Sequence, residues 1–103
     1  MGKKRPERTA RRKAEREARQ LVRDRERLAS LEPGGSPSRP IEVSSSAVIE
    51  IRAQAQRCPQ CAGSYRVEDH RAESAALRMI AVTCQRCGVA RTLWFEITAS
   101  GPN

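Results

Sequence analysis

The sequence predicts a small metal-stabilised β domain of three to four antiparallel strands, preceded by a basic N-terminal α-helix. Three observations support this prediction. All four cysteines lie in two Cys-x-x-Cys pairs, Cys58 with Cys61 and Cys84 with Cys87, and 22 residues lie between the pairs. Apolar and polar residues alternate in short runs around the pairs, which is typical of half-buried strands. Most of the excess positive charge lies at the N-terminus.

The N-terminal segment, residues 1–31, is predicted to be a basic helical arm. Pro6 suits the first helical turn, and no other proline or glycine interrupts residues 6–31. Opposite charges four residues apart, such as Glu7 with Arg11, add only about 0.2–0.5 kcal/mol each. We therefore expect a marginal helix that is partly disordered when free and becomes ordered when bound.

The charge of this arm suggests its partner. Residues 1–27 contain 12 Lys and Arg against 5 Asp and Glu, a net charge of +7, so the rest of the chain carries +1 of the total of +8. A polyanion such as RNA or DNA is the natural partner, with an acidic protein surface or a purely solubilising arm as alternatives. The predicted nucleic-acid contacts are Lys3, Lys4, Arg5, Arg8, Arg11, Arg12, Lys13, Arg16 and Arg19.

Residues 32–46 are predicted to be a linker rich in Pro, Gly and Ser. Such a composition stops the helix and would separate the arm mechanically from the domain that follows. Ile41 and Val43 offer a short edge strand within it. The domain itself is predicted to span residues 47–98, and residues 99–103 are predicted to be a disordered tail.

Four strands are predicted in and around the cysteine pairs. Ile49 to Gln56 alternates apolar with polar residues, and the other three strands lie at 65–70, 77–83 and 91–98. Residues 71–76 are predicted to be a polar hairpin tip, with a turn of helix over 72–79 as the alternative.

Trp94 lies on the last predicted strand. Leu93, Phe95 and Ile97 share one face of that strand, so Trp94 points to the other. It is a candidate partner surface, where a base could stack or a protein could bind. The alternative is that it packs beside Tyr65 or Ile51.

The cysteines are predicted to hold one structural Zn²⁺. Two tight turns that each offer two thiolates supply the four ligands that tetrahedral zinc prefers. Iron is a less favoured occupant, and a thiol redox pair or two disulfides are further alternatives. A domain of this size buries too little apolar surface to fold without such a staple. Since a closed four-thiolate site leaves no coordination position for substrate, we expect no enzymatic activity.

Two further predictions concern the environment of His70 and the location of the protein in the cell. His70, the only histidine, is expected in a solvated hairpin rather than at the metal. The sequence has no long apolar run that would serve as a signal peptide or membrane span, so a cytoplasmic location is expected, without membrane partners or a small-molecule substrate. Reducing conditions there favour metal ligation over disulfides.

The cysteine region resembles the zinc ribbon family over about Cys58–Ile97. The resemblance is carried by Cys58-Pro59-Gln60-Cys61 and Cys84-Gln85-Arg86-Cys87-Gly88 with strands after each turn, and it is greatest for transcript-cleavage elongation factors and RNA polymerase small subunits. It implies zinc at the four cysteines. Those elongation factors carry an Asp-Glu pair at the hairpin tip, where this chain reads Ala72-Glu73-Ser74, so the cleavage activity is not expected here.

The predicted function is therefore non-enzymatic. We expect a zinc ribbon protein whose basic arm binds nucleic acid or a transcription or translation complex, such as a ribonucleoprotein or a polymerase. The alternatives are a protein-protein adaptor that docks through the ribbon surface and a thiol redox protein.

Overall fold

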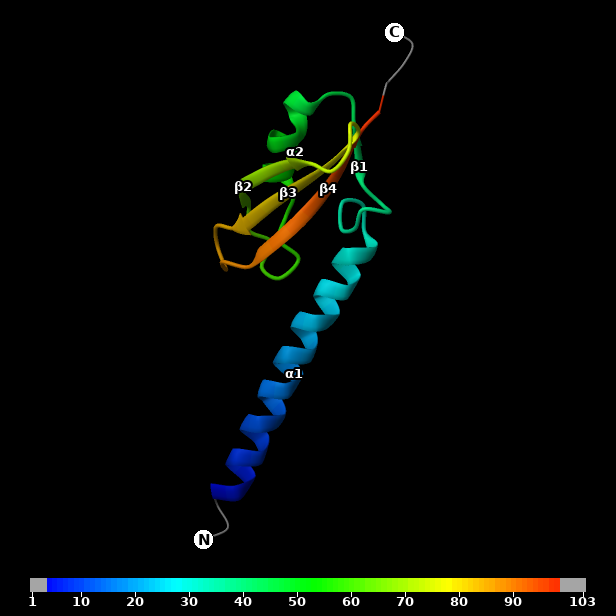
Figure 1. Cartoon of the computed structure of the whole chain (residues 1–103). Coiled ribbons are helices and arrows are strands. Elements are labelled where there is room, and N and C mark those ends of the chain that lie inside the picture. The colour runs from blue at the N-terminus through cyan, green and yellow to red at the C-terminus, as the bar shows by residue number, and fades with distance from the viewer. Residues whose placement is uncertain (1–3, 99–103) are drawn as a thin grey trace.

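The computed structural model describes residues 4–98 and shows one long helix attached to a small mixed domain (Figure 1). The molecule is elongated, with extents of 75 × 23 × 20 Å. Lys3 and the predicted tail 99–103 lie outside the described residues. The elements, in chain order, are α1 (Lys4–Leu31), β1 (Ile41–Val43), the 3₁₀ turn η1 (Ser46–Val48), α2 (Ile49–Ala55), β2 (Tyr65–Ala72), β3 (Leu77–Cys84) and β4 (Ala90–Ile97).

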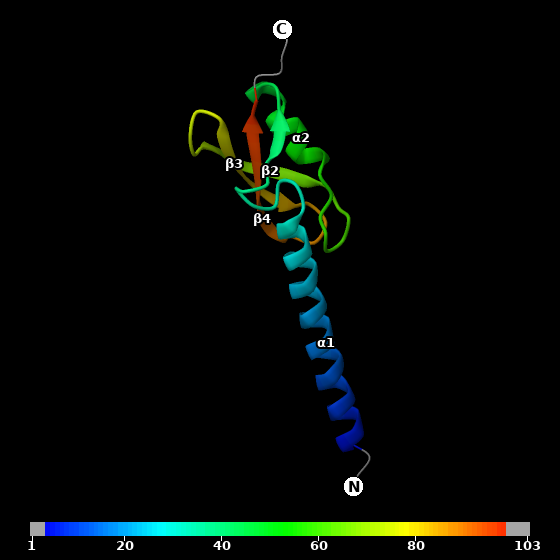
Figure 2. The same cartoon turned by 90° about the vertical axis from the view of Figure 1, so that its right-hand side faces the viewer.

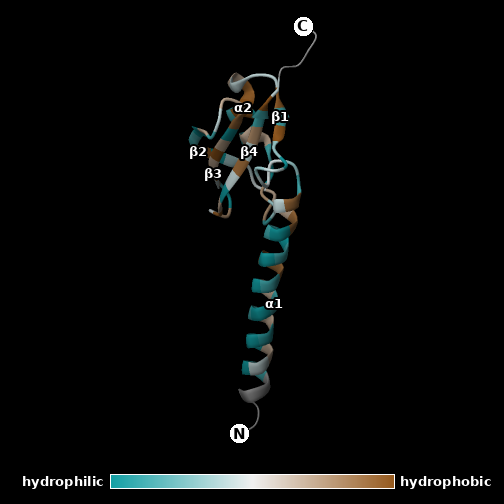
Figure 3. Ribbon diagram, turned by 45° about the vertical axis from the view of Figure 1, so that its right-hand side comes forward, coloured by the Kyte–Doolittle hydropathy of each residue, from teal (hydrophilic) through white to brown (hydrophobic). Residues whose placement is uncertain are grey.

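The predicted N-terminal helix is present as α1, which is 28 residues long. The side chains from Glu7 to Arg23 are exposed, so this part of the helix extends away from the domain. Figure 3 shows α1 as mainly hydrophilic along its length, with apolar residues nearer the domain. Packing against the rest of the chain is confined to its C-terminal turns.

The sheet has four strands in the order β1-β4-β3-β2. The strands predicted after the two cysteine pairs are confirmed as β2, β3 and β4, and they pair antiparallel. The prediction of a fully antiparallel sheet is wrong for β1, which runs parallel to β4 with Ile41 opposite Phe95 (Figure 2). A long stretch of chain separates β1 from β4, so no tight hairpin turn constrains their relative direction.

The predicted strand over residues 49–56 is wrong, because Ile49–Ala55 forms the helix α2. Ile49 and Ala53 are four residues apart and are both fully buried, whereas Ile51 is 67% exposed. Short alternating segments place apolar residues at i and i+4 as well as at i and i+2, so their periodicity does not separate helix from strand. Ser45 begins the helical region by accepting a hydrogen bond from the Ala47 N–H at 2.9 Å.

The core lies between α2 and one face of the sheet. Its largest fully buried side chains are Tyr65, Phe95, Ile49, Ile80, Val82 and Cys84. Cys84 belongs both to this core and to the cysteine cluster. The apolar core is thus continuous with the candidate metal site.

The segment between α1 and β1 is folded against the sheet and is not a free linker. The Trp94 N–H donates to the Gly34 carbonyl at 2.9 Å, and the Gly34 N–H donates to the Arg39 carbonyl at 2.6 Å. Arg39 also donates through Nη1 to the Leu31 carbonyl at 2.5 Å, which satisfies one free carbonyl at the end of α1. Gly34 has φ +87°, and a Cβ there would meet Ile41 Cδ1 at 2.7 Å. The prediction that a linker separates the arm mechanically from the domain is therefore wrong.

Candidate metal centre

The four cysteines predicted as ligands lie together at one end of the sheet. Their four Sγ atoms are all within 4.8 Å of one another. Cys58 Sγ and Cys87 Sγ are 3.7 Å apart, and Cys61 Sγ and Cys84 Sγ are 3.4 Å apart. A tetrahedral zinc site with Zn–S bonds of about 2.3 Å has sulfur–sulfur edges of about 3.8 Å. The arrangement therefore fits one tetrahedral metal ion.

The two cysteine turns have the same backbone hydrogen bond. The Ala62 N–H donates to the Cys58 carbonyl at 2.7 Å, and the Gly88 N–H donates to the Cys84 carbonyl at 3.0 Å. Ala62 and Gly88 also share a left-handed conformation, with φ of +63° and +81°. Glycine takes this conformation without strain, whereas alanine does not. The first turn is thus a strained copy of the second.

Backbone N–H groups surround the sulfur atoms. The Gln60 N–H lies 3.4 Å from Cys58 Sγ, the Gly63 N–H lies 3.4 Å from Cys61 Sγ, and the N–H groups of Arg86 and Cys87 lie 3.3 and 3.4 Å from Cys84 Sγ. Such bonds stabilise thiolates and orient them toward a metal.

The thiols affect one another's protonation. The N–H of Cys87, followed by other hydrogen bonds, lowers the pKa of Cys84 to about 6. The pKa of Cys87 is raised to about 12: the Val89 N–H lowers it, but burial and the neighbouring cysteine sulfurs outweigh that bond. One thiolate therefore opposes ionisation of the next. A bound dication would remove this opposition, because it stabilises all four thiolates at once.

Gly63 lies against the second turn. A Cβ at this position would lie 2.7 Å from Arg86 Cβ, 2.9 Å from Cys84 Sγ and 3.2 Å from Cys61 Sγ. No side chain fits there without moving a sulfur. Gly88 is the opposite case, since a Cβ there would meet nothing within 4 Å.

The C-terminal part of α1 is fixed on the first cysteine turn. Gln60, between Cys58 and Cys61, donates through Nε2 to the Val22 carbonyl at 3.0 Å and to Glu26 Oε2 at 2.7 Å. Arg91 on β4 donates to Glu26 Oε1 at 2.6 Å. These contacts join residues more than 30 positions apart. These contacts were not predicted from the sequence, because nothing in the local pattern singles out Gln60 or Glu26.

Arg91 links this contact to the core. Its Nε donates to the Tyr65 hydroxyl at 2.9 Å. The hydrogen bond from Arg91 lowers the pKa of the Glu26 carboxyl, and burial raises the pKa of Tyr65 to about 12. Burial opposes the charge on Arg91, but its hydrogen bond to Glu26 prevails and the pKa of Arg91 is raised. Glu26 and Arg91 are therefore held as an ion pair.

The predicted nucleic-acid contacts lie along α1, away from the cysteines. Arg8, Arg11, Arg12, Lys13, Arg16 and Arg19 are all exposed. Lys4 and Arg5 belong to the first turn of α1, of which only the backbone is described, and Lys3 lies outside the described residues. The structure thus places the basic arm and the cysteines in separate regions, connected through the C-terminal turns of the helix.

His70 differs from its expected surroundings, whereas Trp94 lies on the strand face expected for it. The His70 side chain is only 19% exposed and lies between Glu50 of α2 and Arg78 of β3, at 3.4 Å from each. The expectation of a solvated histidine is wrong. Trp94 is half-buried on the sheet face opposite α2, so Ile51 of α2 is not its neighbour. It lines a cavity of about 700 Å³ together with Ser30, Pro33, Ala81, Thr83 and Thr92.

Comparison with protein-family profiles, curated proteins and solved structures found no match for this chain. Among the described residues, no helix combines the length and the apolar character needed to cross a membrane. The features of the molecule that bear on function are therefore the four-cysteine cluster, the basic helix and the contact between them.

Proposed function

We propose that this protein is a non-enzymatic zinc ribbon protein that binds nucleic acid, or a nucleic-acid complex, through α1. The observation that supports this most is the attachment of a long, exposed, basic helix to the turn that carries Cys58 and Cys61. A structural metal would fix that turn and, through it, the direction of the helix. The arm then presents its charge to a partner from a defined position.

The arginines of α1 form a continuous face. Arg8, Arg12, Arg16, Arg19, Arg23 and Arg27 follow one another at spacings of three or four, so they lie on one side of the helix. This face is about 28 Å long at 1.5 Å per residue. Nucleic-acid backbones carry phosphates densely enough for several of these arginines to bind at once. Contacts to phosphate position a protein without reading sequence, and we expect binding of this kind.

Zinc is proposed for the cysteines because four sulfur donors at tetrahedral spacing suit it best. Such a site is closed and contributes to folding rather than to catalysis. Elemental analysis of the purified protein is expected to find one zinc per chain. Iron in its place, with the rubredoxin-like colour that four thiolates give it, would contradict this part of the proposal.

Salt dependence tests the role of the arm. The logarithm of the affinity for a labelled RNA or DNA should fall linearly with the logarithm of salt concentration, with a slope of about −0.7 to −0.9 for each phosphate bound. Replacing Arg8, Arg12 and Arg16 by glutamine should reduce the magnitude of that slope by about 2 to 3. An unchanged slope would show that the arm does not bind phosphate.

An adaptor function is the second candidate, favoured by the cavity beside Trp94. A partner protein could place a side chain there, between the end of α1 and the sheet. Pull-down after nuclease treatment distinguishes the two functions, because partners held through nucleic acid are lost and direct protein partners remain. A thiol redox function has less support, since the candidate nucleophile Cys58 is only 2% exposed.

A further inference from the structure

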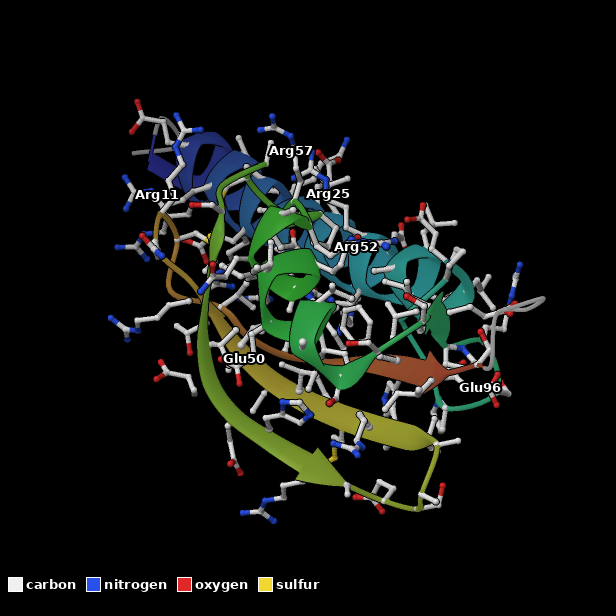
Figure 4. All side chains as sticks on the ribbon, turned by 90° about the horizontal axis from the view of Figure 1, so that it is seen from above. Arg11, Arg25, Glu50, Arg52, Arg57 and Glu96 are labelled. Carbon is white, nitrogen blue, oxygen red and sulfur yellow. The ribbon has the colours of Figure 1, made fainter. Side chains whose placement is uncertain are left out.

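Three arginines from three parts of the chain gather on the first cysteine turn. Arg25 of α1 donates to the Gln60 carbonyl, Arg86 of the second turn to the Cys61 carbonyl, and Arg57 to the Ala62 carbonyl, each at 3.3 Å. The three acceptors are consecutive residues, whose Cα atoms are about 3.8 Å apart along the chain. The guanidinium groups therefore surround one short segment. Figure 4 shows Arg25 and Arg57 on the same side of the molecule, beside the junction of α1 and the domain.

These arginines keep their capacity to bind a further group. All three residues are exposed, and within the described residues none of them lies within ion-pair distance of a carboxylate. A guanidinium has five N–H donors. Each of the three arginines uses one donor for the carbonyl contact described above, so its other donors are available to a ligand. Arg66, Arg71 and Arg91, by contrast, are paired with acids. Free guanidinium donors are thus present at the cysteine turn as well as along α1.

Neutralisation of the metal site does not account for the whole cluster. A dication held by four thiolates has a formal charge of −2, and three guanidinium groups exceed it. The carbonyl contacts also fix the arginines in place before any ligand arrives, which lowers the entropic cost of binding. Guanidinium groups held in this way match the geometry of phosphate oxygens.

We propose that Arg25, Arg57 and Arg86 form a phosphate-binding cluster for the nucleic-acid backbone. This inference rests on the proposed function and extends it from the arm to the cysteine turn. Arg25 lies on another side of α1 from the arginine face, so the cluster would bind backbone phosphates in addition to those held by that face. The metal site would then contribute to binding by holding the segment on which the cluster is built.

The test compares variants of equal charge in the full zinc-loaded chain. The cluster variant is Arg25→Gln with Arg57→Gln, since neither residue lies between two cysteines. The control is Arg66→Gln with Arg71→Gln, which removes two charges from β2. Affinity is measured by fluorescence anisotropy between about 50 and 200 mM salt with a labelled single-stranded RNA and, separately, a DNA duplex.

The cluster variant should lower the magnitude of the salt slope by about 2, with a larger loss of affinity than the control. Arg25→Lys with Arg57→Lys should keep most of the slope, because the charge remains. Equal effects of the cluster and control variants would overturn the proposal. If the α1 variants still reduce binding in that case, the proposed function stands and only the cluster fails; if they do not, the proposed function fails as well. The probe with the greater loss identifies the nucleic acid bound.

A second measurement is independent of affinity. Addition of the preferred probe to ¹⁵N-labelled protein should shift the side-chain Nε–H signals of Arg25, Arg57 and Arg86, but not those of Arg66 and Arg71. Shifts confined to arginines of the N-terminal part of α1 would contradict the cluster.

Discussion

Ala62 and Gly88 occupy the same position in the two cysteine turns and differ in how well they suit it. Both residues have positive φ, but only glycine adopts it without strain. A non-glycine residue in this region costs of order 1 kcal/mol or more. The first turn therefore carries strain that the second does not. The cysteine spacing was readable from the sequence, because ligand spacing is local, whereas the identity of the strained residue required the backbone.

We expect Ala62→Gly to stabilise the metal-loaded protein by up to about 1 kcal/mol, because relief of strain exceeds the entropy that glycine adds to the unfolded chain. The reverse change, Gly88→Ala, should destabilise by about 1 kcal/mol or more through strain alone, since space around it is open. Urea unfolding with zinc present measures both. A loss of stability in Ala62→Gly would show that the turn is not strained.

Gly63→Ala should weaken metal binding itself. The added methyl group would lie within 3 Å of Cys84 Sγ and Arg86 Cβ, so a ligand must move. We expect zinc affinity to fall about tenfold or more, in the range seen when the surroundings of a metal ligand are disturbed. Competition with a chromophoric chelator gives the affinity. Gly88→Ala is the matched control, and a similar small effect in both would contradict the predicted clash.

At the scale of elements, α1 and the domain are joined by long-range polar contacts. Glu26 meets both Gln60 and Arg91, and Gly34 accepts a bond from Trp94. The helix and three strands were predicted correctly because their patterns are local and long. The helix α2 was predicted as a strand, because its seven residues fit both the two-residue period of a strand and the 3.6-residue period of a helix. The prediction of a free linker was wrong, because a composition rich in Pro, Gly and Ser indicates only how flexible the isolated segment is. It does not indicate that a distant strand will donate a hydrogen bond to the Gly34 carbonyl.

Glu26→Gln should loosen the C-terminal part of α1 from the first cysteine turn. In the folded state the pKa of Glu26 is lowered from its ordinary value of 4.5. The carboxylate therefore stabilises the docked helix fully above pH 4.5, and this stabilisation is lost as the pH falls through the lowered pKa of the folded state. The wild type should therefore lose docking in that acidic range, while the variant, already weakened at neutral pH, has no such dependence.

Distances between a label on α1 and one on β2, measured by double electron–electron resonance, would follow this docking. Acid also affects the thiols, but it does so in both proteins. The difference in distance distribution between wild type and Glu26→Gln therefore reports the effect of the Glu26 carboxyl alone. An identical and narrow distance distribution for both proteins at neutral pH would contradict a role for Glu26 in holding the helix.

At the scale of the whole molecule, an exposed helix extends from a domain whose core and cysteine cluster share residues. Cys58 and Cys84 are counted among the ten buried core residues, so the metal site and the apolar core should fold together. The cysteine turn then holds α1, and exposed arginines lie both along one face of α1 and at the cysteine turn. The sequence predicted the parts, but their connection depends on contacts between residues distant in the chain.

The central claim is that a metal at the four cysteines organises both the domain and the direction of the arm. Removal of the metal by a strong chelator, followed by far-UV circular dichroism, tests it most directly. We predict loss of the strand signal and its recovery on addition of one equivalent of zinc, since the free energy of metal binding is folding free energy here. A strand spectrum that is unchanged in metal-free protein would contradict the account.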